Sequence, residues 1–262
     1  MSVKSAEGVF SVLHALAAAA EPKSASELAH TARLPLTSAS RAIATLEAAG
    51  FARRVNGAAR FELGNAAQVL AYAFMSQFPI RDAALPYLQQ LVTVSGVSTS
   101  LFVRLGRYAV RVAFIAGTNS VINVNALGEA RLLSEGAAGL AMLAHCDLLE
   151  SSLMPSDSSR ESIEARLEEI RSRGHAWEES TLEQGGHDLG VALLDSASKP
   201  LACVVLEGVT AEQSTFLTPP LQAVFLELQR RLEGDSELLQ SHYAHVEHTR
   251  IELGPDLSLR AG

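Results

Sequence analysis

The most informative polar residues of this chain are three hydroxyl side chains and one arginine in a short segment: Thr37, Ser38, Ser40 and Arg41. Apolar residues at Ala39, Ile43 and Leu46 follow offsets of four and three, which predicts a helix with one buried stripe. The four polar residues fall at the N-terminus of that helix and largely outside the stripe. Hydroxyl and guanidinium groups placed there donate hydrogen bonds to phosphates and base edges, so the segment predicts contact with DNA.

Other groups of reactive residues carry weaker patterns. His145 and Cys146 are neighbours, and neighbours on a helix point about 100° apart, so they do not readily form a thiolate with its base. His242, His245 and His248 are spaced three apart in a predicted helical tail, which suits either metal ligands on one face or an ordinary solvated face. No glycine-rich phosphate loop or catalytic triad reaches motif quality. We therefore expect no enzymatic activity, no cofactor and no bound metal.

The segments around the polar helix predict a small DNA-binding fold. Residues 5–20 have a helical apolar period, and residues 24–27 form a capping box that begins a second helix. Gly50 ends the third helix. Two short strands, 51–55 and 59–63, flank an Asn-Gly turn. Three helices and a hairpin make a winged helix-turn-helix, whose third helix enters the major groove. Its wing has three arginines that can reach phosphates or the minor groove: Arg53, Arg54 and Arg60.

The charge of the chain is unevenly distributed. The formal net charge is −8, which by itself argues against nucleic-acid binding. Residues 1–65 carry seven Lys/Arg and five Glu, a net charge of +2, while the remainder carries 14 basic and 24 acidic residues, a net charge of −10. This asymmetry indicates a DNA-contacting N-terminus on an acidic body. So small a positive charge neutralises few phosphates, and we therefore expect a dimer, which doubles the contacts.

Length and composition set the remaining bounds. A chain of 262 residues with 48 % apolar content can form one large or two medium domains with well-packed cores. Cys146 and Cys203 are too few for a disulfide framework and lie among apolar residues, as small buried side chains do. No apolar run approaches a membrane span and no signal segment begins the chain, so we expect a cytoplasmic protein without membrane contact.

The N-terminal segment closely resembles the IclR family of bacterial transcriptional regulators. The resemblance is carried at family spacing by Val3 to Glu7, Val9, Phe10, Val12, Leu13, Leu34, Pro35, Thr37, Ser38, Arg41, Thr45 to Glu47, Gly50, Phe51, Arg53, Arg54 and Arg60 to Gly64. Two positions depart from it. Leu36 stands where a basic residue is common, and Glu62 where a basic or polar residue is frequent. Both departures weaken phosphate contact and leave the geometry intact.

The resemblance implies a domain organisation for the whole chain. We expect a winged helix-turn-helix in residues 1–65, a linker helix in 66–79, an effector-binding domain in 80–250 and a C-terminal tail in 251–262. The linker helix and the helix after it are expected to help form a homodimer, with a tetramer as the alternative, although a simple surface helix would give the same pattern.

The C-terminal body predicts an α+β fold. Strands are expected at 99–105, 108–116, 121–124, 130–133, 189–194 and 201–206, and helices at 136–146, 158–173 and 217–232. The last two strands are joined by a hairpin turn. The resemblance implies a GAF-like sensor with its pocket between sheet and loops.

The resemblance also places an effector pocket, at Ser134, Gly136, Ala137, Leu140, Asp188, Leu189 and Glu207. Most members of the family bind small organic acids, but this chain has carboxylates at Asp188 and Glu207. Burying a carboxylate beside an anionic ligand is costly. We therefore expect a neutral, hydroxylated or cationic effector, or a degenerate pocket. In the alternative alignment, Asp188 is a turn residue and the register is shifted by one or two positions.

Together these patterns predict a transcriptional regulator, either repressor or activator, that binds a palindromic operator on double-stranded DNA. A small-molecule effector that prefers one of two arrangements of the dimer would change operator affinity. Two alternatives remain open at this point. One is a ligand-binding enzyme with an ancillary winged helix, and the other is a protein-interaction module that uses the winged helix as a docking surface.

Overall fold

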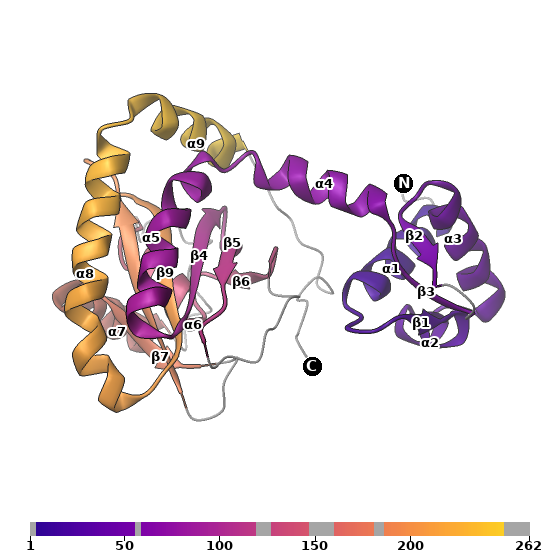
Figure 1. Cartoon of the computed structure of the whole chain (residues 1–262), viewed down its shortest axis with the longest axis horizontal. Helices are drawn as coiled ribbons and strands as arrows, with labels where there is room; N and C mark the ends of the chain where they lie inside the picture. Colours follow the sequence, from indigo (N-terminus) through magenta and orange to yellow (C-terminus); the bar gives the residue numbers. More distant parts are fainter. Residues whose placement is uncertain (1–3, 56–58, 119–126, 147–159, 181–185, 249–262) are drawn as a thin grey trace. The chain divides into compact units, whose positions relative to one another are not determined.

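The computed structural model describes residues 4–55, 59–118, 127–146, 160–180 and 186–248 (Figure 1). These residues form two compact units, divided between Ser76 and Gln77. None of the helices in the described ranges combines the length and the apolar character that a membrane crossing requires.

The N-terminal unit is a winged helix-turn-helix followed by one more helix. Its elements are α1 (Lys4–Ala17), β1 (Lys23–Ser24), α2 (Ala25–Thr31), α3 (Leu36–Ala48), β2 (Ala52–Arg54), β3 (Arg60–Leu63) and α4 (Asn65–Met75). The three strands form an antiparallel sheet in the order β1-β3-β2. The predicted helices and hairpin are confirmed, and β1 is an addition that the sequence did not indicate.

The local sequence explains where these helices begin and end. The capping box is present at α2, where the Ser24 hydroxyl accepts from the Glu27 amide and the Glu27 carboxylate accepts from the Ser24 amide. Gly50 follows α3 with a left-handed φ of 75°, as expected for a residue just beyond a helix end. The predicted stripe of α3 is buried, and it forms one core with α1, α2 and the sheet. That core holds the opposite, polar face of α3 outward.

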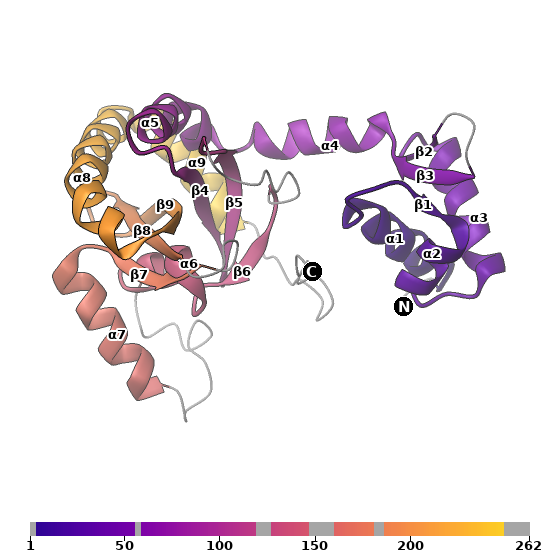
Figure 2. The ribbon, with the colours of Figure 1, turned by 60° about the horizontal axis from the view of Figure 1, so that its bottom comes forward.

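The C-terminal unit is a six-stranded antiparallel sheet with helices on both faces. Its elements are α5 (Pro79–Ser95), β4 (Ser98–Leu105), β5 (Tyr108–Ile115), β6 (Ala130–Leu132), α6 (Gly136–Leu143), α7 (Arg160–Arg173), β7 (Ala176–Glu179), β8 (His187–Leu194), β9 (Pro200–Val209), α8 (Ala211–Glu233) and α9 (Ser236–His248). The strand order is β6-β5-β4-β9-β8-β7. Figure 2 shows α6 and α7 on one side of this sheet and α5 and α8 on the other.

The alternation along β9 explains the two faces. Cys203 and Val205 pack with α6 in one core, while Val204 faces residues of α5 and α8, among them Leu88 and Leu228. Successive side chains of a strand point to opposite faces, so an apolar strand of this kind serves two helical layers. Glu207 is two residues beyond Val205 and therefore belongs to the α6 face.

The expected α+β fold is confirmed, with two qualifications. Strand β7 is an addition that the sequence did not indicate. The strand expected at 121–124 and the first residues of the helix expected at 158–173 lie outside the described residues. The hairpin between the last two strands is present as the antiparallel pair of β8 and β9.

Candidate DNA-contacting surface and effector pocket

The N-terminal end of α3 exposes the polar residues that the sequence singled out. Pro35 precedes the helix as its N-cap, and its carbonyl accepts from the Ser38 and Ala39 amides. No side chain caps the helix, so the Leu36 and Thr37 amides are left without a capping group. Thr37, Ser38, Ser40 and Arg41 are all exposed. Within the described part of the chain, no ion pair links Arg41 to an acidic residue. This surface therefore presents donors, backbone amides and one uncompensated positive charge.

Two further residues extend this surface. Leu36, the first residue of α3, has 53 % of its area exposed. Arg33 is exposed in the turn between α2 and α3, with an unusual left-handed φ of 55°. The sequence analysis counted Arg33 only toward the charge of this region. Its position in the turn was visible in the sequence, but its backbone conformation was not.

The three wing arginines are paired with acidic residues of the same unit. Arg53 lies directly across the sheet from Glu62, with Nη2 2.5 Å from Oε1. Arg54 Nε lies 3.9 Å from Glu47 Oε1, and its guanidinium carbon is 4.9 Å from the centre of the Phe61 ring.

Arg60 is held more firmly than the other two wing arginines. Its Nε donates to the Pro22 carbonyl at 2.7 Å, and its Nη2 lies 3.3 Å from Glu27 Oε2. Glu27 is also the acid of the α2 capping box. Arg60 thus joins β3 to the start of α2, and it has a structural role that the sequence did not indicate.

A small pocket opens on the α6 face of the C-terminal sheet. It is lined by Phe102, Ala109, Arg111, Arg131, Glu135, Gly136, Ala137, Ala138, Gly139, Asp188, Val205 and Glu207. The start of α6 forms one wall and lies very close to the sheet, because a Cβ on Gly190 would be 2.7 Å from the Ala137 carbonyl oxygen. The cavity is about 20 Å³, close to the space that one water molecule needs.

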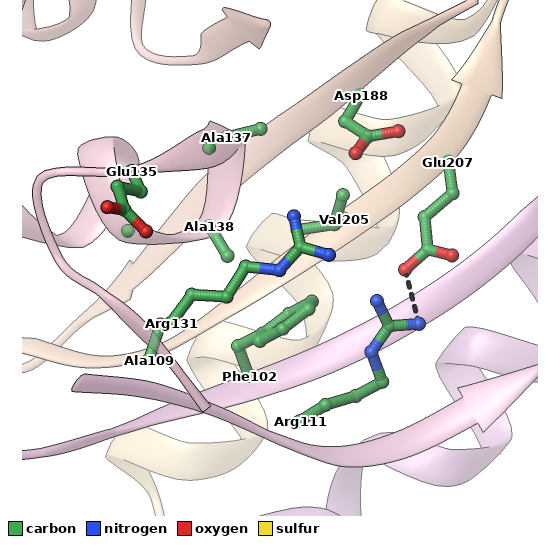
Figure 3. Close-up of a pocket in the computed structure, with 12 residues that line it drawn as sticks. Phe102, Ala109, Arg111, Arg131, Glu135, Ala137, Ala138, Asp188, Val205 and Glu207 are labelled. Carbon is green, nitrogen blue, oxygen red and sulfur yellow. Dashed lines mark ion pairs between the residues drawn. The ribbon is translucent and has the colours of Figure 1, made fainter. Parts of the chain in front are cut away.

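A network of linked charges lies at this pocket, and Figure 3 shows its Arg111–Glu207 ion pair. Arg111 of β5 has 3 % of its side chain exposed, and its Nη1 lies 2.9 Å from Glu207 Oε1. Its Nη2 lies 3.1 Å from Glu129 Oε2, and Nη1 also donates to Ser100 Oγ at 3.2 Å. Arg131 Nε donates to Glu129 Oε1 at 2.6 Å. Two guanidinium groups and two carboxylates are therefore linked in one chain.

Asp188 adds a third carboxylate at the edge of the network. Its Oδ1 accepts from the Gly208 amide at 3.1 Å. Burial raises the pKa of Asp188, against the lowering effects of the Ser180 hydroxyl, the Gly208 amide and the charges of Arg111 and Arg131. Burial likewise raises the pKa of Glu207, and the Arg111 charge opposes that rise. Desolvation thus outweighs the neighbouring cations at both carboxyls.

The structure brings four of the seven expected effector residues to the pocket: Gly136, Ala137, Asp188 and Glu207. Leu140 and Leu189 are each 1 % exposed and belong to the core. Ser134 is half-buried in the turn before α6 and does not line the cavity. The sequence analysis missed Arg111, Glu129 and Arg131. A single arginine in the middle of an apolar strand is a recognisable sign of a buried, paired charge, and Arg111 shows that pattern.

The remaining candidate groups have structural surroundings. His242 is 1 % exposed, and its Nε2 lies 3.1 Å from the Leu201 carbonyl oxygen. The side chains of His245 and His248 lie outside those described. Within the described ranges, no cluster of three or more potential ligating side chains is present. Cys146 and Cys203 are buried, and burial raises the pKa of the Cys203 thiol.

Family models match both units of this chain. Residues 5–56 match the IclR helix-turn-helix domain, and residues 72–225 match the C-terminal domain of the bacterial transcriptional regulator IclR. The chain belongs to the IclR family. It is a DNA-binding transcriptional regulator with an effector-binding C-terminal domain, and not an enzyme. Among curated proteins, none matches the chain significantly.

Solved structures of the IclR family share its fold. IclR of Thermotoga maritima is 24 % identical with a TM-score of 0.69, covering 88 % of this chain and 99 % of its own. HmgR of Pseudomonas aeruginosa is 25 % identical with a TM-score of 0.66, covering 87 % and 99 %. An IclR homologue from Microbacterium hydrocarbonoxydans, solved in complex with 4-hydroxybenzoate, is 17 % identical with a TM-score of 0.71, covering 88 % and 99 %.

Proposed function

We propose that the exposed N-terminal face of α3 contacts operator DNA, with Arg41 as its central residue and Thr37, Ser38 and Ser40 beside it. The observation that carries this proposal is the exposure of Arg41 with no ion pair among the described residues. An unpaired guanidinium can donate two parallel hydrogen bonds to a guanine edge or to a phosphate without first breaking a contact. We propose residues 1–65 as the DNA-binding domain. Because a bacterial regulator of this kind must reach the chromosome, we also propose that it acts in the cytoplasm.

The wing arginines have a different part in this proposal. Arg53 and Arg54 contribute salt-dependent affinity through phosphates, because ion pairs on an exposed surface contribute only about 0–1 kcal/mol and a phosphate can replace the carboxylate. Arg60 contributes less to DNA binding, since it holds both a carbonyl and a carboxylate of its own unit.

We further propose that the protein is a homodimer on a palindromic operator, with a tetramer as the alternative assembly. Helix α4, in the proposed linker 66–79, supports a dimer because it is almost wholly apolar and none of its residues is buried. Its exposed fractions include 67 % for Val69, 58 % for Leu70 and 76 % for Tyr72. An apolar helix face of this kind marks a surface for another protein, and a second copy of the chain would supply an identical helix.

The pocket on the α6 face is the proposed effector site of the domain spanning residues 80–250. The formal charge of its lining supports a neutral, hydroxylated or cationic ligand, since Glu135, Asp188 and Glu207 outnumber Arg111 and Arg131. The cavity is water-sized, so an effector must displace side chains as it binds, and its preference for the displaced state would supply the switch. Tight calorimetric binding of an aromatic or dicarboxylic acid that persists in Asp188→Ala would contradict this ligand class.

The decisive experiment is capture of genomic fragments by the purified full-length protein, followed by sequencing and by titration of the recovered site. Arg41→Ala should weaken binding to that site by about 10- to 100-fold, corresponding to about 1–3 kcal/mol, and leave the unfolding midpoint unchanged. Arg173→Ala removes an exposed arginine from α7 and should change neither quantity. Unchanged operator affinity in a folded Arg41→Ala protein would refute the assigned role.

A further inference from the structure

Glu207 is the one acidic partner of Arg111 that also lines the pocket among the described residues. Its side chain is 3 % exposed, and its Oε1 lies 2.9 Å from Arg111 Nη1, with the Ser100 hydroxyl as a further polar neighbour. Glu129 also pairs with Arg111, but it is tied to Arg131 as well and lies outside the cavity lining. Glu207 is therefore the carboxylate that pairs with the buried guanidinium within the pocket itself.

Burying the Glu207 carboxylate costs a desolvation free energy that a purely structural role would not be expected to require. Removing two charges from water carries a penalty that a buried pair often fails to recover, and well-packed apolar residues commonly do as well or better. On this face of the sheet, the apolar side chains of Val205 and Phe102 also line the pocket beside the charged groups. A pocket whose floor is a buried guanidinium is, by its chemistry, a site for a carboxylate. Here the chain itself supplies that carboxylate.

We infer that Glu207 is a tethered ligand: its carboxylate occupies the place on Arg111 that a free carboxylic acid would fill and thereby closes the pocket to anions. This inference rests on the proposal that the pocket is the effector site, and it states how that site is regulated. Because Glu207 already pairs with Arg111, the wild-type protein remains in the arrangement that a bound acid would favour. It then responds only to a ligand that does not compete with Glu207 for Arg111. Removal of the side-chain carboxylate should create an anion site.

Chemical rescue tests this directly, because a glutamate side chain is an alanine side chain with acetate added. In full-length Glu207→Ala, the unfolding midpoint should fall by several degrees, since Arg111 loses a buried partner. Sodium acetate should raise that midpoint by about 3–5 °C at ten times its Kd, at constant ionic strength. Acetamide, a neutral molecule of the same shape, and sodium chloride should produce no such rise.

Three further proteins serve as controls. The wild type should show no acetate-specific shift, because the site is already occupied. Glu179→Ala removes an exposed carboxylate of β7 that does not line the pocket and should behave like the wild type. In the double variant Glu207→Ala/Arg111→Met, acetate should not raise the unfolding midpoint. Acetate that stabilises the wild type as much as Glu207→Ala, or that fails to stabilise a folded Glu207→Ala, would overturn the inference.

Urea titration covers the case in which Glu207→Ala is largely unfolded in buffer. Its refolding midpoint should rise in acetate and not in acetamide, and equal midpoints in the two would contradict the inference. Operator affinity distinguishes this inference from the proposed function. If acetate stabilises Glu207→Ala but leaves its operator affinity unchanged, the inference that Glu207 is a tethered ligand is supported, and the proposal that the pocket is an effector site is contradicted. If wild-type protein binds no DNA, the DNA-contacting role fails and the acetate result is unaffected.

Discussion

At the scale of single residues, the exposed arginines of the N-terminal unit differ in whether an acidic residue already pairs with them. Arg41 has no ion pair within the described residues, whereas Arg53, Arg54 and Arg60 each have a carboxylate within 4 Å. An exposed ion pair contributes only about 0–1 kcal/mol, so these carboxylates compete with phosphate without preventing contact. We therefore expect the acids of the N-terminal unit to reduce the DNA affinity of the wing, an effect that the net charge alone does not show.

Glu62→Gln tests this competition at Arg53, its partner directly across the sheet. Releasing that arginine should raise operator affinity by about two- to fivefold, the equivalent of up to about 1 kcal/mol. It should also steepen the decrease of affinity with salt, because one more phosphate is neutralised. Fluorescence anisotropy across a salt series measures both quantities. Glu21→Gln changes the net charge equally at an exposed site with no ion pair among the described residues, and a similar gain there would mean that charge alone is responsible.

Asp188 allows a prediction on pH. Burial raises its pKa in the folded protein, so its ionised form destabilises the fold above that pKa, and the cost disappears as pH falls and the carboxyl takes a proton. Asp188→Asn should therefore raise the unfolding midpoint by a few degrees at pH 8, and the difference from wild type should narrow toward pH 5. Asp82→Asn, at a side chain 72 % exposed, is the control. A difference that widens on acidification would contradict the assigned direction.

At the scale of elements, periodicity located most of the fold. The apolar stripe of α3, the capping box of α2 and the apolar runs of β8 and β9 are all local patterns, and local patterns are visible in a sequence. Strands β1 and β7 were missed because β1 has only two residues and β7 ends in two glutamates, so both are recognised mainly by their pairing partners. The pocket was half predicted for the same reason, since Arg111 and Glu207 meet only through the order of strands in the sheet.

Helix α6 lies close to the sheet because Gly190 leaves room for it. A Cβ there would be 2.7 Å from the backbone oxygen of Ala137, so Gly190→Ala should displace the start of α6 and cost about 1–3 kcal/mol. Gly8→Ala adds the same methyl group inside α1, where the Cβ would be 3.6 Å from a Leu34 methyl, and it should gain about 0.5–1 kcal/mol. Hydrogen exchange at the amides of α6 and α1 measures each change locally. Equal changes in stability for the two substitutions would show that the space around the added methyl group does not determine the outcome.

At the scale of the whole molecule, the distribution of charge is one reason for proposing a dimer. Residues 1–65 carry a net charge of only +2, while the rest carries −10. One such N-terminal unit neutralises few phosphates, so its affinity for DNA is low, because the electrostatic part of that affinity grows with the number of phosphates neutralised. Two N-terminal units on one operator double the phosphate contacts. Because a dimer joins the two units, binding of the second unit becomes effectively intramolecular. An exposed apolar helix next to the DNA-binding fold is where such a linkage would be expected.

Leu70→Glu tests that role of α4. A charge placed on the apolar face should weaken self-association by about tenfold or more, the equivalent of about 1–2 kcal/mol lost at a central contact. Gln68→Glu adds the same charge at an exposed polar position of the same helix and should leave association unchanged. Sedimentation over a concentration series measures the dimer constant. Affinity for a full palindrome should fall in Leu70→Glu while affinity for a single half-site stays constant, since each α3 surface remains intact and only the coupling between two of them is lost. A protein that stays dimeric with Glu at position 70 would place the interface elsewhere in the chain.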